Sequence, residues 1–183
     1  MADDWPREFA DFNLIVKPHE NSYVSSQRAP HRRKMDAWRS TPNVYVAAPH
    51  EYDPVPFMAA SDLLISDASS VLFEFAATGR PVVRCDFLAI PLRQRWLLRH
   101  RLRLDPTIAP YADGAAPVAR YRDLRATVER ELAEPGRRAE QRARATRMLI
   151  GSTDGRVSER IAGHLLAVAQ GDAADDPARS RAV

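Results

Sequence analysis

The sequence predicts an α/β protein with a parallel sheet and helices on both of its faces. Short, fully apolar runs alternate with segments of helical spacing, an order typical of parallel strands joined by right-handed crossovers. The stretch from Ser61 to Val83 shows this most clearly, because an apolar strand leads into acidic and hydroxyl residues and then into a helix. The chain has 183 residues, enough to bury the core of one domain.

The predicted sheet occupies the amino-terminal half. Apolar runs place its strands at residues 13–16, 43–47, 63–65 and 82–86. We expect a short helix over 55–60, since Pro54 and Pro56 suit a helix start, and a second helix from Val71 to Gly79. The segment 21–41 is polar, so we expect it to be irregular, with a cationic cluster at 31–34.

The carboxyl-terminal half is arginine-rich and predicted to be helical. Helical spacing indicates helices over 121–133, 137–149 and 155–169, the last capped by Ser152 or Asp154. Residues 92–102 suit either a helix or an active-site loop, and 105–117 resemble a connector. The arginines between 137 and 147 are expected to form a solvated helix face. We expect one domain over 1–170 and a disordered tail over 171–183.

The composition of the chain limits the classes of molecule that it is expected to bind. The net charge is +3, and 25 of the 27 cationic residues are arginine, which suits anionic ligands or an anionic membrane surface. Nucleic acid is disfavoured, because aromatic residues do not interleave with the basic clusters. The start of the chain lacks the order of a secretion signal and no run could span a membrane, so we expect a cytoplasmic protein. Cys85, the single cysteine, is expected to be an inert core thiol.

The turn after the third strand is the strongest candidate for a ligand site. Ser66, Asp67, Ser69 and Ser70 follow an apolar strand and precede a helix that starts at Val71, and ligands bind at this edge of open α/β sheets. Hydroxyl and amide donors there could hold a diphosphate, and Asp67 could accept a hydrogen bond from a ligand hydroxyl. The alternative is that the serines only cap the helix and that Asp67 only fixes the turn.

Other polar residues end neighbouring strands. His19 follows the first strand, which places its imidazole at the same edge as a general acid, a base or a phosphate donor, although a lone histidine is more often structural. Arg84 and Asp86 end the fourth strand and could flank the same ligand. The cluster at 50–53 lacks the spacing of metal ligands, and no metal or cofactor is expected.

Several of these segments together resemble the CDP-glycerol glycerophosphotransferases of teichoic acid synthesis, a family of cell-wall enzymes. The resemblance extends over roughly residues 12–169 and rests on motifs in a fixed order: KPHE, NVYVAAPHEYD, MAASDLLISDASSVLFEFAATGRPVV and STDGRVSERI. It implies the carboxyl-terminal, donor-binding, Rossmann-like half of a GT-B fold. It also implies a transferase that moves glycerol phosphate from CDP-glycerol to a polyol-phosphate or lipid-linked acceptor, peripheral at the inner face of the membrane.

The resemblance assigns roles residue by residue. His19 matches the family's motif histidine, assigned to catalysis or to donor phosphate contact. The donor pocket is matched at Ser66, Asp67, Ser69, Ser70 and Val71. Three departures stand out: Ala68 replaces the usual tyrosine, Glu20 replaces the common proline, and the family's earlier first strand and acceptor domain are not found. A partner chain would then have to supply the acceptor domain and its second histidine.

Two other functions remain open at this point. The chain could be a catalytically silent remnant that still binds a nucleoside diphosphate. It could instead be another GT-B enzyme, such as a nucleotide-sugar glycosyltransferase or an epimerase.

Overall fold

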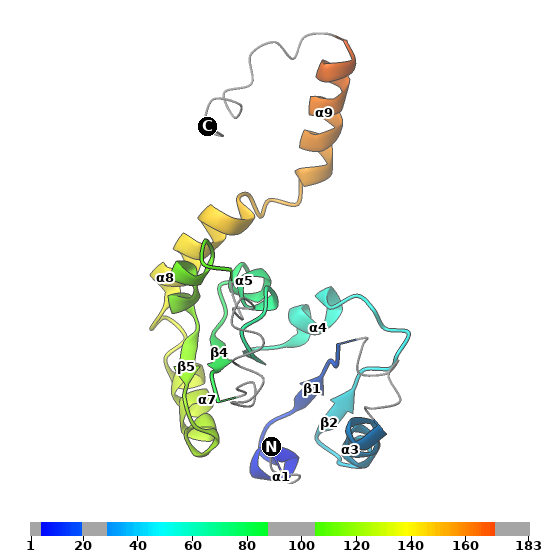
Figure 1. Cartoon of the computed structure of the whole chain (residues 1–183), viewed down its shortest axis with the longest axis vertical. Coiled ribbons are helices and arrows are strands. Elements are labelled where there is room, and N and C mark those ends of the chain that lie inside the picture. Colours follow the sequence, from blue (N-terminus) through cyan, green and yellow to red (C-terminus); the bar gives the residue numbers. More distant parts are fainter. Residues whose placement is uncertain (1–4, 20–28, 88–104, 171–183) are drawn as a thin grey trace, which may run out of the picture.

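The computed structural model describes residues 5–19, 29–87 and 105–170, with the backbone alone for 29–32 (Figure 1). It is a mixed α/β structure whose parallel strands are flanked by helices, a Rossmann-like arrangement that confirms the predicted class. β1 (Leu14–Val16) pairs in parallel with β2 (Val44–Val46). The second sheet is also parallel and has the order β3 (Leu64–Ser66), β4 (Val82–Cys85), β5 (Ala116–Val118).

Helices connect the strands as the alternating pattern requires. α3 (Ala29–Arg39) lies between β1 and β2, α4 (Val55–Ala60) between β2 and β3, and α5 (Val71–Ala76) between β3 and β4. α1 (Trp5–Glu8) precedes the first strand. The carboxyl-terminal half contains η2 (Ala109–Gly114), η3 (Tyr121–Asp123), α7 (Leu124–Ala133), α8 (Ala139–Ala145), η4 (Thr146–Ile150) and α9 (Val157–Ala169).

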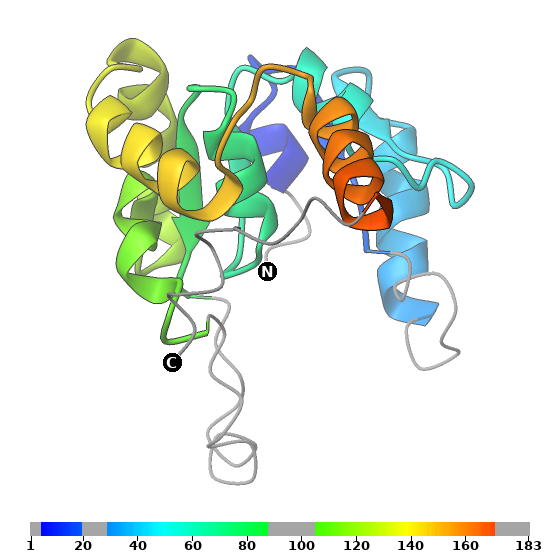
Figure 2. The ribbon, with the colours of Figure 1, turned by 90° about the horizontal axis from the view of Figure 1, so that it is seen from above.

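Alternating side chains of β4 point to two apolar layers. Val83 and Cys85 pack with Leu124 and Val128 of α7, in a cluster that also contains Leu14 of β1. The intervening Val82 packs instead with residues of α5. Helices therefore cover both faces of this sheet, and β1 shares a core with β4 and β5. Figure 2 shows α7 and α8 on one side of the molecule, α3 on the other and α5 between them.

Arg142 corrects the expectation of a fully solvated arginine face on α8. Its side chain is only 1% exposed, and its guanidinium donates to the carbonyl oxygens of Gly79 at 3.1 Å and Pro135 at 2.5 Å. Gly114 of η2 permits this packing, since a Cβ there would lie 3.2 Å from the Arg142 side chain. Arg142 thus ties α8 to the turn that follows α5 and packs against η2.

Other expectations about secondary structure were wrong, in segments where the apolar pattern of the sequence is weak. Residues 29–39 form helix α3 rather than irregular chain, and 116–118 form a fifth strand that begins within the expected connector at 105–117. The residue that caps α9 is Arg156, although Asp154 accepts a hydrogen bond from the Arg156 amide at 3.1 Å. The expected helix or loop at 92–102 and the expected tail at 171–183 lie outside the described residues.

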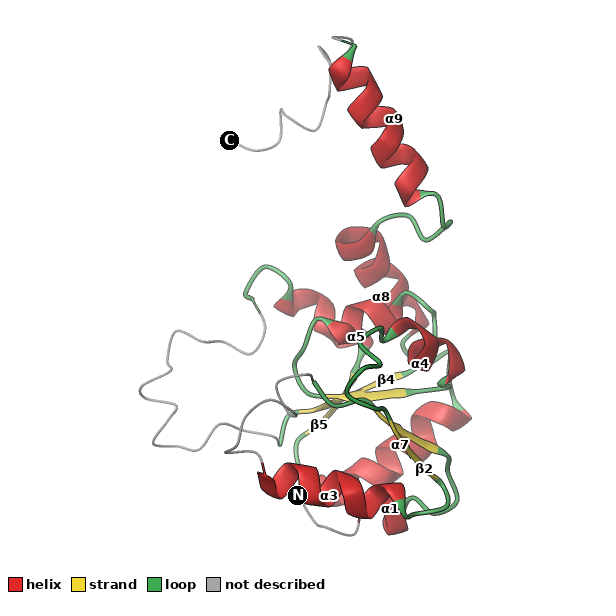
Figure 3. Ribbon diagram, turned by 90° about the vertical axis from the view of Figure 1, so that its right-hand side faces the viewer, coloured by secondary structure: helices red, strands yellow, loops and turns green. Residues whose placement is uncertain are grey.

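α9 stands apart from the body of the protein (Figures 1 and 3). It follows a linker in which Gly151 and Gly155 adopt φ values of 84° and 73°, a conformation that favours glycine. The large apolar side chains of α9 are between 51% and 62% exposed, namely Val157, Ile161, Leu165, Leu166 and Val168. None of the helices in the described ranges is both long and apolar enough to cross a membrane.

Candidate functional site

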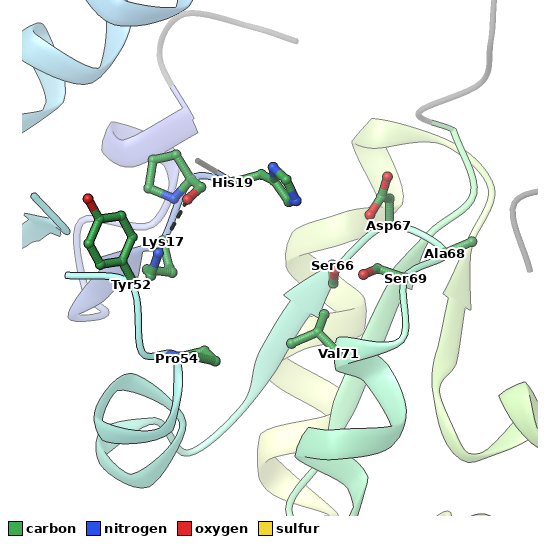
Figure 4. Close-up of a pocket in the computed structure, with 10 residues that line it drawn as sticks. Lys17, His19, Tyr52, Pro54, Ser66, Asp67, Ala68, Ser69 and Val71 are labelled. Carbon is green, nitrogen blue, oxygen red and sulfur yellow. Dashed lines mark hydrogen bonds between the residues drawn. The ribbon is translucent and has the colours of Figure 1, made fainter. Parts of the chain in front are cut away.

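A cavity of about 710 Å³ opens at the carboxyl ends of β1 and β3, within the size range of small-molecule sites (Figure 4). Three loops line it: the end of β1, the β2–α4 loop and the β3–α5 turn. Its lining residues are Lys17, Pro18, His19, Tyr52, Pro54, Ser66, Asp67, Ala68, Ser69 and Val71. The structure therefore brings together most of the residues that the sequence singled out.

The β3–α5 turn supplies the polar wall of the cavity. Ser66 is the last residue of β3, and Asp67 and Ser69 follow it. Among the residues that the structure describes, the hydroxyls of Ser66 and Ser69 have no hydrogen-bond partner, and the Asp67 carboxylate has neither a hydrogen bond nor an ion pair. These groups face the cavity (Figure 4) and remain available to a ligand.

Some backbone amides of the same segment are engaged and others are free. The Ser69 amide donates to the carbonyl oxygen of Asp67 at 2.9 Å, and the Leu72 and Phe73 amides of α5 donate to the carbonyl oxygens of Ser69 and Ser70 at 3.2 and 2.9 Å. Within the described residues, the amides of Ala68, Ser70 and Val71 donate to no protein acceptor. This part of the chain therefore offers free backbone amides as well as side-chain hydroxyls.

Ser70 and Arg84 do not line the cavity. Ser70 is the residue that precedes α5; its side chain makes no capping hydrogen bond and is exposed. The Arg84 guanidinium pairs with both carboxylate oxygens of Asp86, at 2.7 and 3.0 Å, and also donates to the carbonyl oxygen of Ala112. Because Arg84 lies on the α5 side of β4, its side chain contacts η2 instead of the cavity.

β1 positions a second wall of the cavity. The chain continues from Val16 into Lys17, Pro18 and His19, and the imidazole of His19 points across the cavity toward Asp67 (Figure 4). The Lys17 ammonium lies 3.5 Å from the carbonyl oxygen of Pro18. One end of the cavity thus combines a cation and an imidazole with hydroxyls, groups that suit an anionic ligand.

The β2–α4 loop adds Tyr52 and Pro54, which sequence reasoning did not assign to the site. Glu51 fixes this loop: its carboxylate oxygens lie 2.8 and 2.9 Å from the Tyr45 hydroxyl, and one accepts from the Ala48 amide at 2.5 Å. These hydrogen bonds hold the pKa of Glu51 below its usual value and raise the pKa of Tyr45. Position alone could have indicated Tyr52, since its loop also follows a parallel strand.

The polar residues at 50–53 stabilise the β2–α4 loop. Glu51 is bonded as described, and Asp53 accepts a hydrogen bond from the Val55 amide at 2.9 Å, at the start of α4. Within the described ranges, no group of three or more histidine, cysteine, aspartate or glutamate side chains could hold a metal ion.

Cys85 is a core residue beneath the site. Its side chain is 3% exposed, and burial, with the Asp67 and Asp86 carboxylates, raises the thiol pKa to about 12. A thiol in this state is a poor nucleophile, which agrees with the inert role that its strand setting predicts.

Comparison with protein families gives a match over residues 7–87, to the model described as CDP-glycerol:poly(glycerophosphate) glycerophosphotransferase, a transferase family. Comparison with curated proteins and with solved structures gives no match. The matched segment runs from α1 to the end of β4 and contains every residue that lines the cavity. It stops before the carboxyl-terminal half, so the expected family motif at 152–161 lies outside it. Residues 7–87 are therefore similar to the CDP-glycerol:poly(glycerophosphate) glycerophosphotransferase family.

Proposed function

We propose that this chain binds CDP-glycerol and takes part in the transfer of its glycerol phosphate to a polyol-phosphate or lipid-linked acceptor. One observation carries the proposal: His19 and the turn from Ser66 to Ser69 face the same cavity, and both lie in the segment that matches the family. The hydroxyls of this turn have no partner among the described residues, so they are available to the donor's phosphates.

The chemistry requires a base and stabilisation of the leaving phosphate. The acceptor hydroxyl oxygen forms a bond to the phosphorus that carries glycerol, and the bond from this phosphorus to the oxygen of CMP breaks. His19 takes the proton of the acceptor hydroxyl, and CMP leaves with the electron pair. Lys17 and the hydroxyls of Ser66 and Ser69 stabilise the phosphate charge during this step.

Asp67 has a different role in this proposal. A carboxylate would repel phosphate, so Asp67 suits a hydroxyl-bearing part of the donor, such as glycerol or ribose, from which it can accept a hydrogen bond. An acceptor-binding domain, in the same protein or in a partner chain, completes the proposed enzyme. A lipid-linked acceptor would bring the complex to an anionic membrane surface.

The test compares donors and then compares variants. Calorimetry is expected to show that the full chain binds CDP-glycerol more tightly than UDP-sugars. With an acceptor-domain protein added and a glycerophosphate polymer as acceptor, CMP release is expected to fall by roughly 10²- to 10⁴-fold in His19→Gln, the range of a lost general base. Donor affinity is expected to change far less.

Three results would contradict the proposal, each in a different part. Tighter binding of a UDP-sugar than of CDP-glycerol would favour a nucleotide-sugar enzyme. Full CMP release by His19→Gln would remove His19 from the mechanism. Binding of CDP-glycerol without any transfer by wild type, even when an acceptor-domain protein is added, would support a silent binding module.

A further inference from the structure

Tyr52 is a large aromatic residue that contributes little to packing. Its side chain is 70% exposed, yet it lines the cavity on the side opposite Ser69 (Figure 4). Its ring contacts no other aromatic ring or cation, and its hydroxyl has no hydrogen-bond partner, among the residues that the structure describes. Exposed aromatic surface at the edge of a cavity is typical of a binding surface.

The backbone on both sides of Tyr52 is anchored. Glu51, immediately before it, is held by the Tyr45 hydroxyl and the Ala48 amide. Asp53, immediately after it, accepts from the Val55 amide at the start of α4. The Tyr45 ring in turn lies 6.1 Å from the ring of Phe57, measured between centroids. A ring carried by such a loop is positioned before a ligand arrives, which lowers the entropy cost of binding.

The two sides of the cavity differ in the polarity of their side chains. Ser66, Asp67 and Ser69 form the hydroxyl and carboxylate side, whereas Tyr52 and Pro54 present flat, largely apolar surface on the other side. Lys17 and His19 lie on the strand end between them. A ligand that satisfied both sides would have a charged, hydrogen-bonding part and a planar ring.

We propose that Tyr52 stacks on the base of a nucleoside diphosphate whose phosphates bind near Ser69. This inference rests on the proposed function and names the part of the donor that the β2–α4 loop recognises. Stacking requires the ring face but not the hydroxyl, so it is sensitive to loss of the ring and tolerant of loss of the oxygen.

The test separates the two parts of the ligand by comparing CDP with inorganic pyrophosphate, which has no base. Tyr52→Leu keeps apolar volume and removes the ring, and Tyr52→Phe keeps the ring and removes the hydroxyl. We expect Tyr52→Leu to weaken CDP binding by about 10- to 100-fold and to leave pyrophosphate binding unchanged. We expect Tyr52→Phe to bind CDP about as well as wild type. Because the residue is exposed, neither variant should change the melting temperature noticeably.

Each result has a separate meaning. Wild-type affinity for CDP in Tyr52→Leu, or an equal loss for CDP and pyrophosphate, would overturn the stacking role. Tyr52-dependent CDP binding in a protein that transfers no glycerol phosphate would support stacking while the proposed function failed. No binding of CDP to wild type would overturn both.

Discussion

The hydroxyl of Tyr45 lies within 2.9 Å of both carboxylate oxygens of Glu51 and so joins strand β2 to the loop that lines the cavity. The two residues belong to the same structural unit, because the Ala48 amide between them also donates to Glu51. A carboxylate with three such contacts fixes the path of the chain at Tyr52, although Glu51 is not among the residues that line the cavity. Glu51 is therefore a positioning residue in this interpretation.

Removal of the Glu51 carboxylate should loosen this loop. We expect Glu51→Ala to weaken CDP binding by about two- to tenfold, the effect of a lost hydrogen bond, with little change for pyrophosphate. Glu140→Ala is the matched control, since Glu140 is an exposed glutamate on α8, far from the cavity in sequence. Calorimetry of the two variants with both ligands measures the difference. Equal affinities for CDP would show that the loop keeps its shape without Glu51.

Two adjacent serines offer a sharper test of the turn. Ser69 lines the cavity and Ser70 does not. Ser69→Ala is therefore expected to weaken the binding of CDP and of pyrophosphate by about 1–3 kcal/mol, whereas Ser70→Ala should bind both as wild type does. Isothermal titration of the two single variants measures this. If Ser70→Ala were the weaker binder, the phosphates would lie on the outer side of the turn.

The position of the cavity was predictable, because the cavity lies at the ends of strands. Apolar runs locate β1 and β3, and parallel strands deliver the residues that follow them to one edge, so His19 and Asp67 could be placed together. The apolar pattern does not show in which direction a side chain points once the strand has ended. Ser70 and Arg84 are close to the site in sequence, but one points to solvent and the other pairs with Asp86.

β5 and α3, which the sequence did not predict, have little apolar periodicity of their own. β5 contains Ala116, Pro117 and Val118, a composition that does not favour a strand, and it forms because β4 offers a free edge. Proline is tolerated there because β5 is an edge strand. α3 was missed because its sequence is rich in charged residues and has few large apolar ones. Met35 and Trp38 supply its contact with the body, and Met35 is only 5% exposed.

The exposed side chains of α9 predict that this helix contributes little to the stability of the body. Leu165 is 62% exposed, whereas Leu72 of α5 is 2% exposed. Leu165→Ala should therefore change the free energy of unfolding of the domain by no more than about 0.5 kcal/mol. Leu72→Ala should lower it by about 2–5 kcal/mol, through lost burial and a cavity. Urea denaturation of both variants tests this, and a large loss in Leu165→Ala would show that α9 packs on other protein surface in solution.

Arg125 of α7 holds the segment that follows α1 and should make stability depend on pH. It donates to both carboxylate oxygens of Asp11, at 3.0 and 2.7 Å, and lies over the rings of Phe9 and Phe12. The hydrogen bond with Arg125 holds the pKa of Asp11 below its usual value. The contribution of this pair is therefore present above the unfolded pKa of an aspartate and is lost as the pH falls through the lowered pKa.

Arg125→Ala should accordingly lower the melting temperature at pH 7, and its deficit relative to wild type should shrink in acid. Arg120→Ala is the control: Arg120 is 66% exposed and pairs with Asp123 at 3.4 Å, so it should have little effect at either pH. Melting curves at pH 7 and pH 3 give the comparison. A deficit of the same size at both would assign the effect to contacts that do not titrate, namely the two rings and the carbonyl oxygen of Glu8.

The reactivity of the Cys85 thiol measures whether the core beneath the cavity is closed to solvent. Since burial raises the thiol pKa to about 12, the native protein should contain very little thiolate near pH 8. Reaction with a disulfide reagent should then be at least about 10³-fold slower than in urea, where the pKa returns to its ordinary value. Addition of CDP should slow the native reaction further, because a ligand of the folded state reduces unfolding. Cys85→Ser is the blank for the assay, and rapid labelling of native wild type would show that β4 opens to solvent without global unfolding.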